Sequence, residues 1–504
     1  MNTAGFLART ALPRALLISL LGGLLAVHAE NPQAQGIQTE PASVEARIGR
    51  VQNGLAEAVR VKGRPESAMA LTDRMRHYKV PGVSIAVIND DKVEWARGYG
   101  VTEADGTRVD SSTLFQAGSI SKPLATMAAL YYVERGAFDL NEDVNRKLLS
   151  WHVPENDLTQ TRPVTLRRLL SHSAGLTVSG FPGYAEGAQL PTLVQVLNGE
   201  PPANTRPVRV DILPGSRWRY SGGGFAVVQL LLEDQAHKPL PAIMQEVVLE
   251  PLDMLHSTFE QPLPAARAPF AASGHEPGDS PVQGRWHTYP EMTAAGLWTT
   301  PSDLAHWAIE VQRAYKGQPN GILSMGMTHE MLTVQSANWG LGLTLEGTGE
   351  SATFGHRGQD KGFTSRLVAF VEGGQGVVVM TNAVSFNLID EIIRSVAHEY
   401  DWSAQRQSEK AVTSVDPEGY KNLVSRYRFD HRDPSVEMNV SSDGKQLFVQ
   451  TGAGAPDEIL PQTELGFFSH ETGTEYTFVR DGGGQAGQLI ILRDGGRYVG
   501  DRIL

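Results

Sequence analysis

Segments with the pattern of β-strands lie at both ends of the first four hundred residues, with a helical region between them. Residues 81–100 form two apolar or alternating runs around an Asn-Asp-Asp turn, which is typical of a hairpin. Strand patterns return only at residues 339–347, 365–373 and 376–382. A sheet made of both groups must join distant parts of the chain around an insertion. The sequence therefore predicts an α+β fold with an antiparallel sheet and a helical region.

Helical patterns fill the remainder of this region. Amphipathic or capped segments occur at residues 44–78, 165–172, 222–235, 299–315 and 387–402. The stretch between the second and third of them is rich in Gly and Pro, which favours irregular loops.

The C-terminal part has a different composition. Residues 403–417 (SAQRQSEKAVTSVDP) are polar and without periodicity, so we interpret them as a linker between a main domain at 65–402 and a C-terminal domain at 418–504. The C-terminal residues form short strand-like runs between Gly and Asp turns. This spacing predicts a small all-β sandwich or barrel.

The N-terminus has the features of a secretory signal peptide. Two arginines and no acidic residue precede an apolar run at residues 15–27, and Val27-His28-Ala29 provides a small-residue cleavage pattern. The alternative is an uncleaved anchor, but the run is short for a membrane span. We expect cleavage near Ala29, a lead-in at 30–64, no stable membrane anchor afterwards, and a periplasmic or secreted location.

The composition argues against several classes of function. The chain has no cysteine, so disulfides, thiolate catalysis and Cys-based metal sites are excluded. Its 14 histidines include no His-x-His or His-x-x-x-His pair, and we expect no metal and no cofactor. The net charge is −12 without a basic stripe, which argues against nucleic acid as a partner.

A serine and a lysine three positions apart form the first candidate for chemistry. Ser119 follows a glycine and precedes a helical pattern, so Lys122 is expected one turn further on the same helix face. The alternative is that Ser119 only caps the helix and that Lys122 is solvated. A second match, Ser442 to Lys445, has Asp-Gly in its middle and is expected in a hairpin turn, where it would carry no site.

Two further motifs follow in order. Tyr220-Ser221-Gly222 precedes a helical pattern, and His356-Arg357-Gly358 precedes a strand pattern. With the Ser-x-x-Lys motif, this order resembles the penicillin-binding protein and serine β-lactamase superfamily. The resemblance is to its class C-like branch, which also holds D-aminopeptidases, DD-peptidases and carboxylesterases. It covers residues 65 to about 400, and the tail more weakly resembles the lipocalin-like β domain of some members.

The resemblance implies a β-lactamase/transpeptidase-like fold and a role for each motif residue. Ser119 would be the acylated nucleophile, and either Lys122 or Tyr220 would take its proton. The backbone N–H groups of Ser119 and Gln359 would form the oxyanion hole, and His356 would face the cleft where many relatives have lysine.

Two positions depart from the family pattern. Gly222 stands where many relatives have an Asn that contacts the substrate's acyl-amide group, so β-lactam specificity is in doubt, and we expect open space beside it. Arg357 replaces a small residue, whereas Gly358 keeps the motif's glycine.

The expected function is a secreted serine hydrolase that forms an acyl-enzyme. Its partner would be a small molecule or short peptide: a β-lactam, including carbapenems, a D-amino-acid peptide or an ester. The alternatives are a penicillin-binding sensor with little turnover, or a non-catalytic binding protein whose C-terminal domain is an interaction module.

Overall fold

The computed structural model describes most of the chain after the N-terminal segment. The expected signal peptide and the first part of the lead-in lie outside the described residues, which are 43–65, 68–103, 106–278, 280–319, 321–430, 435–452, 456–493 and 496–503. In this part of the chain, no helix combines the length and the apolar character needed to cross a membrane.

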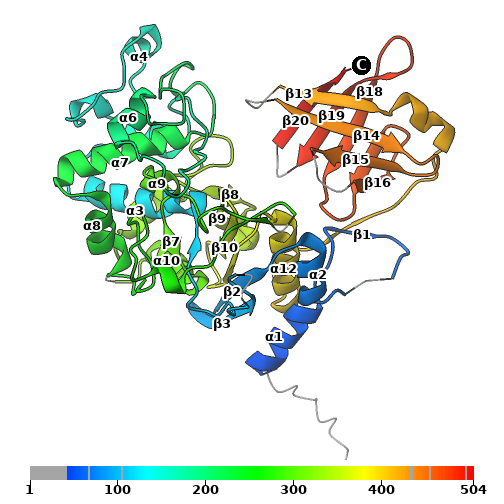
Figure 1. Cartoon of the computed structure of the whole chain (residues 1–504), viewed down its shortest axis with the longest axis horizontal. Helices are drawn as coiled ribbons and strands as arrows, with labels where there is room; N and C mark the ends of the chain where they lie inside the picture. The colour runs from blue at the N-terminus through cyan, green and yellow to red at the C-terminus, as the bar shows by residue number, and fades with distance from the viewer. Residues whose placement is uncertain are drawn as a thin grey trace, which may run out of the picture. The chain divides into compact units, whose positions relative to one another are not determined.

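A six-stranded antiparallel sheet forms the centre of the main domain (Figure 1). Its order is β3-β2-β11-β10-β9-β8, so strands from both ends of the domain meet where β2 pairs with β11. This confirms the predicted α+β fold. The strands are β2 (Gly82–Asn89), β3 (Lys92–Gly100), β8 (Thr344–Glu346), β9 (Thr353–Asp360), β10 (Phe363–Phe370) and β11 (Gly376–Thr381).

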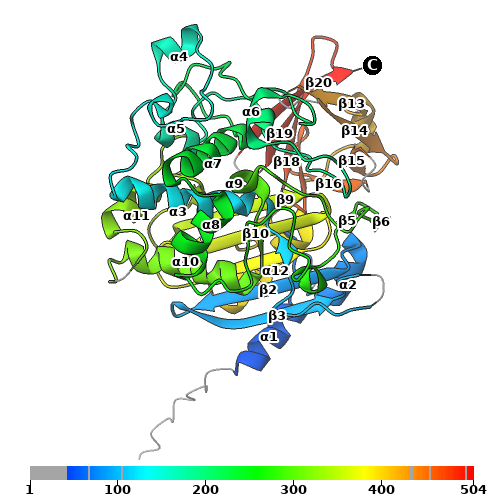
Figure 2. The ribbon, with the colours of Figure 1, turned by 60° about the vertical axis from the view of Figure 1, so that its left-hand side comes forward.

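Helices surround the sheet and form the helical region. They are α1 (Val44–Asn53), α2 (Leu71–Tyr78), α3 (Ser121–Glu134), α4 (Asp157–Thr161), α5 (Leu166–Leu170), α6 (Leu193–Asn198), α7 (Gly222–Ala236), α8 (Leu240–Met244), α9 (Met292–Ala295), α10 (Pro301–Tyr315), α11 (Met325–Met331) and α12 (Phe386–Glu399). Of these, α1, α2 and α12 lie on one face of the sheet, and α3, α7 and α10 lie on the other (Figures 1 and 2).

Both faces of the sheet are buried, which explains why β2 reads as a continuous apolar run. Val83, Ile85 and Val87 pack into the cluster that contains α1, α2 and α12. Ala86 and Ile88 pack into the larger cluster with α3, α7 and α10. The period of two along the strand thus divides the domain into two cores.

The C-terminal domain is a closed antiparallel barrel, which confirms the all-β prediction. Neighbouring strands follow the chain order, and the last pairs with the first. The strands are β13 (Ser425–Phe429), β14 (Val436–Ser442), β15 (Leu447–Thr451), β16 (Asp457–Pro461), β17 (Gly466–Ser469), β18 (Glu475–Arg480), β19 (Ala486–Arg493) and β20 (Gly496–Ile503). Aromatic and aliphatic side chains form its core, among them Tyr427, Phe467 and Phe478.

The expected lead-in and linker pair with each other. β1 (Val59–Val61) lies parallel to β12 (Ser408–Lys410), inside the segment interpreted as a linker. β1 also divides the helical pattern expected over residues 44–78 into α1 and α2. The polar residues of β12 are largely exposed and show no apolar pattern, so composition alone could not predict this pairing.

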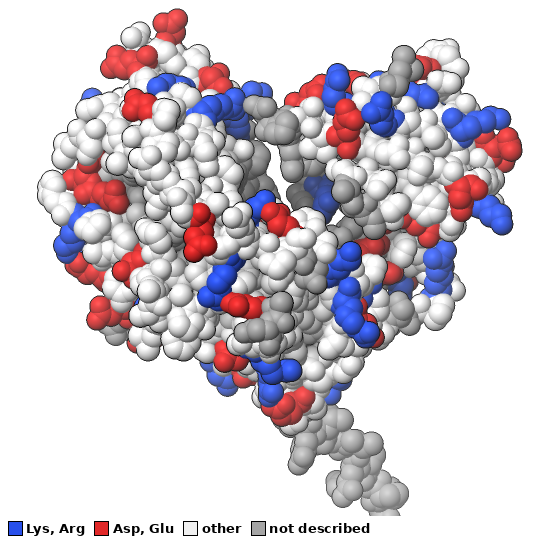
Figure 3. All heavy atoms as spheres, viewed as in Figure 1, with Lys and Arg blue, Asp and Glu red and all other residues white. Residues whose placement is uncertain are grey.

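Acidic and basic side chains are interspersed on the face shown in Figure 3.

Two further pairs of short strands lie outside the main sheet and the barrel. β4 (Phe115–Gln116), which precedes the Ser-x-x-Lys motif in the chain, pairs with β7 (Trp298–Thr299). β5 (His275–Glu276) pairs with β6 (Ser280–Pro281).

Candidate active site

A tight turn presents Ser119 at the edge of the helical region. Gly118 begins a 3₁₀ turn, Gly118–Ile120, with φ +52°. A Cβ at Gly118 would lie 2.5 Å from the backbone nitrogen of Gln359, so only glycine fits between the turn and the end of β9. Ile120, and not Ser119, occupies the N-cap position of α3. The structure therefore does not support a mere capping role for Ser119.

Lys122 is buried and directed at the serine. The residues from Ser121 to Leu130 are all buried, which brings the lysine into the protein interior at 2% exposure. Its Nζ donates to Ser119 Oγ at 2.9 Å and to the carbonyl oxygen of Ala294 in α9 at 2.7 Å. Burial lowers the pKa of Lys122 to about 7, while the nearby carboxylate of Asp360 acts in the opposite direction.

Tyr220 lies on the other side of the serine hydroxyl. Its side chain hydrogen bonds to Ser119, and Lys122 Nζ is 5.0 Å from its ring centroid. Burial raises the pKa of the Tyr220 phenol above its usual value of 10.0. The phenol is thus protonated at neutral pH, whereas a substantial fraction of Lys122 is neutral.

His172 contacts the Tyr220 ring and the backbone of the next residue. Its Nδ1 accepts the N–H of Ser221 at 3.1 Å, and its ring centroid is 4.2 Å from that of Tyr220. Ser221 in turn caps α7, because its hydroxyl accepts the N–H of Gly224 at 2.9 Å. The cap and the histidine together fix the tyrosine at the beginning of α7.

β9 carries the third motif along the candidate site. β8 pairs with β9 only between Thr353 and Gly355, so no strand of the described chain pairs with this side of β9 from His356 onward. The His356 side chain is buried, its Nδ1 lies 2.5 Å from the carbonyl oxygen of Arg357, and burial and Lys122 lower its pKa to about 3. The imidazole is therefore neutral at physiological pH and brings no charge to the site.

The remaining motif positions depend on close backbone approach. A Cβ at Gly358 would lie 1.9 Å from the carbonyl oxygen of Ala117, which explains why the motif ends in glycine. Gln359 follows with an exposed side chain and a backbone nitrogen against Gly118. The Arg357 guanidinium forms an ion pair with Asp390 of α12, with Nη2 3.3 Å from Oδ2.

Gly222 is not beside open space, so that expectation is wrong. A Cβ at this position would lie 3.1 Å from the ring of Phe181 and 3.2 Å from the carbonyl oxygen of Ser179. The Gly222 N–H donates to that same oxygen at 3.1 Å. Phe181 thus occupies the space next to Gly222, and no local signal in the Gly- and Pro-rich segment predicted this contact.

Two buried acids were not predicted: Asp360, which interacts with Lys122, and Glu291, which interacts with Asp360. Asp360 is 5% exposed and Glu291 is fully buried; Asp360 Oδ2 and both Glu291 oxygens have no hydrogen-bond partner among the described residues. Burial raises the pKa of Asp360 well above its ordinary value and that of Glu291 to about 7. In the sequence, Asp360 belongs to a Gln-Asp-Lys-Gly stretch that reads as an ordinary turn.

A cavity of about 450 Å³ lies beside the candidate site: Tyr220 and His356 line it, whereas Ser119, Lys122 and Gln359 do not. Its walls combine aromatic side chains with two arginines, a glutamate and smaller residues, and two of its residues come from the barrel. The principal lining residues are Trp218, Tyr220, Trp339, His356, Arg357, Arg366, Gly496 and Tyr498. Across the described residues, no group of three or more His, Asp or Glu side chains is arranged to hold a metal ion.

The second Ser-x-x-Lys match has none of these features. Ser442 Oγ donates to the carbonyl oxygen of Gln446 at 2.8 Å, and Asp443 accepts the N–H of Lys445 at 2.8 Å. These bonds close an exposed hairpin turn, as the sequence predicted.

Similar proteins are known for most of the chain. The chain is 24% identical over 327 residues to Protein flp of Staphylococcus aureus (strain N315), covering 60% of each protein. It is 26% identical over 257 residues to the unguisins hydrolase ungD of Aspergillus violaceofuscus, covering 47% of this chain and 42% of that protein. The chain thus spans about 60% or less of the length of these curated relatives.

Solved structures share the fold. The octameric penicillin-binding protein homologue from Pyrococcus abyssi superimposes with a TM-score of 0.56 at 20% identity, covering 85% of this chain and 98% of that one. The β-lactamase/D-alanine carboxypeptidase from Yersinia pestis has a TM-score of 0.51 at 19% identity, covering 66% of this chain and 97% of that one. The family model described as Beta-lactamase matches residues 68–398. With its ordered motifs, its sheet and this match, the chain belongs to the β-lactamase family.

Proposed function

We propose that the protein is a serine hydrolase that acts through an acyl-enzyme on Ser119. The observation that carries the proposal is the 2.9 Å contact between Ser119 Oγ and the Nζ of a buried lysine. A buried lysine with a pKa of about 7 is available as a base near neutral pH, which a solvated lysine is not.

In the proposed reaction, neutral Lys122 accepts the Ser119 proton as Oγ bonds to the substrate's carbonyl carbon. The backbone N–H groups of Ser119 and Gln359 stabilise the oxyanion. The bond to the leaving group then breaks, and the leaving group takes a proton passed from Lys122 through the Tyr220 hydroxyl. Water cleaves the acyl-enzyme by the same sequence and restores Ser119.

The substrate class is a β-lactam, a D-amino-acid peptide or a small ester. The Phe181 ring beside Gly222 favours compact acyl groups over large acylamino side chains. Carbapenems, which have a hydroxyethyl group in that place, are thus favoured over cephalosporins.

Intact-protein mass spectrometry tests the proposal. The protein is incubated with penicillin G, a carbapenem and p-nitrophenyl acetate, and turnover is followed in parallel. A covalent adduct on Ser119 with turnover of any of the three supports a hydrolase. A stable adduct without turnover indicates a penicillin-binding sensor, and the absence of both overturns the proposal.

The activity should depend on pH through Lys122. Because Lys122 is the base only when neutral and its pKa is about 7, we expect kcat/KM for p-nitrophenyl acetate to rise tenfold per pH unit below that value and to level off above it. His356 should add no limb between pH 5 and 8, since its pKa is about 3.

Asp360→Asn provides the matched variant for this profile. In its ionised form the Asp360 carboxyl raises the pKa of Lys122, so its removal should move the acid limb to lower pH. A limb that stays in place would show that Asp360 is already neutral at that pH, as its raised pKa allows, and a limb that moves to higher pH would show that another group titrates.

Gly222→Asn should not by itself create the missing amide contact. Its side chain would meet the Phe181 ring at 3.1 Å, and overpacking of this kind typically costs about 1–3 kcal/mol. We expect a lower melting temperature for the single variant. The double variant Gly222→Asn with Phe181→Ala should gain activity selectively on penicillin G compared with p-nitrophenyl acetate. Equal changes on both substrates would contradict a role in acylamino recognition.

We also propose that the protein is exported and that residues 1–29 are removed, because these residues have the charge and apolar pattern of a signal peptide. The mass of the chain recovered from the medium or periplasm of an expressing bacterium tests this, and a retained Met1 would contradict it.

A further inference from the structure

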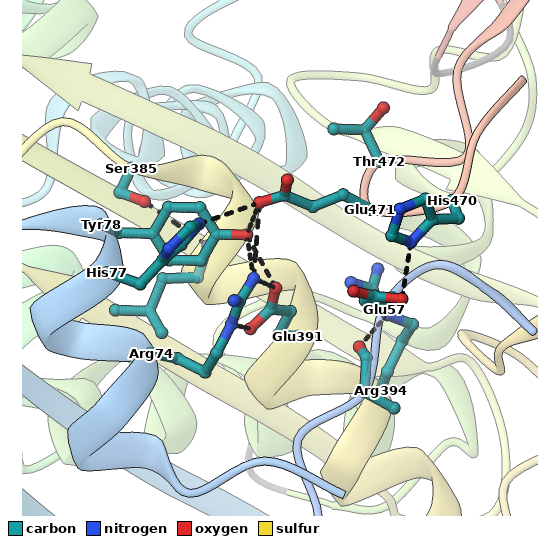
Figure 4. A network of polar contacts seen from close by, with 12 residues as sticks. Glu57, Arg74, His77, Tyr78, Ser385, Glu391, Arg394, His470, Glu471 and Thr472 are labelled. Atoms are coloured by element: carbon teal, nitrogen blue, oxygen red, sulfur yellow. Dashed lines mark hydrogen bonds and ion pairs between the residues drawn. The ribbon is translucent and has the colours of Figure 1, made fainter. Parts of the chain in front are cut away.

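The turn between β17 and β18 of the barrel contacts the main domain through buried charges (Figure 4). Glu471 of this turn contacts the Tyr78 hydroxyl and lies 3.4 Å from Arg74, both on α2. Tyr78 and Arg74 also bond to Glu391 of α12, at 2.7 and 2.5 Å. Glu391 is fully buried, Arg74 is 12% exposed and Glu471 is 23% exposed, so this contact is partly screened from solvent.

A second contact anchors the same turn. His470 Nδ1 lies 2.6 Å from Glu57 Oε2, and the backbone N–H groups of Ala58 and Val59 donate to the carbonyl oxygens of Glu471 and His470. The hydrogen bond between the His470 and Glu57 side chains raises the pKa of His470 and lowers that of Glu57, as expected for a charged pair. An apolar cluster of Val59, Val61, Leu460 and Phe468 packs beside it.

The barrel connects this turn to the cavity through neighbouring strands. Tyr476, five residues after Glu471, pairs with Ile491 on β19, and Ile491 pairs with Tyr498 on β20. Two strand spacings separate the ends of this row, about 10 Å. Tyr498 lines the same cavity as Tyr220 and His356.

The main domain makes the corresponding connection through α12. Glu391, which binds the Arg74 and Tyr78 side chains, follows Asp390, which pairs with Arg366 at 2.5 Å and with Arg357 at 3.3 Å. Both arginines line the same cavity as Tyr498. One helix therefore holds the docking contact and one wall of the cavity.

We propose that Glu471 is a positioning residue, which fixes Tyr498 as a wall of the substrate cavity by locking the barrel turn to Arg74, Tyr78 and Glu391. In this arrangement the barrel determines which substrates fit and does not take part in the chemistry at Ser119. The proposal rests on the proposed function only in treating this cavity as the substrate site. Whether Glu471 fixes the position of Tyr498 can be measured without any enzymatic activity.

The absence of cysteine permits a direct test of that position. In the variant Tyr498→Cys, the introduced thiol is the only one, and its rate of modification by a fluorescent maleimide is measured at fixed pH. Adding Glu471→Ala should raise the rate about fivefold or more, as expected when a contact that restricts access is lost. Adding Glu464→Ala, which removes a carboxylate that pairs with Arg480 on the exposed surface of the barrel, should leave the rate unchanged. Equal rates with and without Glu471 would overturn the lock.

A double-mutant cycle tests the effect on specificity. Glu471→Ala should raise KM for penicillin G or a p-nitrophenyl ester with a phenylacetyl group about tenfold, while kcat for p-nitrophenyl acetate stays within about twofold. If Glu471 acts through Tyr498, then adding Tyr498→Ala should change KM no further. Additive effects would show that Glu471 does not act through Tyr498. A wild-type protein without turnover would overturn the proposed function, while the labelling experiment would still decide the lock.

Discussion

Ser119→Ala should abolish covalent labelling by penicillin G and lower kcat for every substrate by about 10⁴-fold or more, the range for loss of the nucleophile in serine hydrolases. The physical reason is that the Ser119 hydroxyl is the group that Lys122 Nζ and Tyr220 both contact. The protein should remain folded, because Ser119 does not cap α3 and is only partly buried. Intact mass, steady-state kinetics and the melting temperature check the three parts of this prediction.

Ser442→Ala is the matched control for the Ser-x-x-Lys pattern. Ser442 has the same spacing to a lysine but lies in an exposed turn of the barrel. We expect neither labelling nor turnover to change. A labelled residue other than Ser119 in the Ser119→Ala variant would show that the nucleophile is wrongly assigned.

Tyr220→Phe should lower kcat/KM by about 10²–10⁴-fold, the range for loss of a positioned proton-transfer group. Phenylalanine retains the contacts of the ring with His172, Trp218 and Trp339 and removes only the hydroxyl that bonds to Ser119. The free energy of unfolding should change by only about 1 kcal/mol.

The pH profile of Tyr220→Phe separates the two candidate bases. Burial raises the pKa of the phenol and lowers that of Lys122, so the lysine is the group that titrates near neutral pH. If Lys122 is the base, the acid limb should persist in the Phe variant at a lower rate. Loss of the limb would assign it to Tyr220, and an unchanged rate would make the tyrosine structural.

The fold of the main domain could be predicted from local patterns because its strands and helices are apolar on the faces they bury. The apolar periodicity is clear in the strands at residues 81–100 and 365–382 and in the amphipathic helix before Trp402. Few other secondary structures would bury the same residues. The pairing of β1 with β12 could not be predicted, because the three residues of β12 are all polar and leave no periodic apolar signal. Its geometry depends on contacts between segments almost 350 residues apart.

By itself the sequence determined the family, the order of its three motifs and the α+β and all-β division of the chain, since these depend on residue type and spacing along the chain. Only the tertiary structure decided the environment of those residues. Burial lowers the pKa of Lys122, Phe181 occupies the space beside Gly222, and Asp360 lies near the lysine. It also brought Tyr498 of the barrel to the same cavity as His356. These properties arise from segments that are distant in the sequence, where desolvation and steric contact are set by the packed neighbours and not by the local residue pattern.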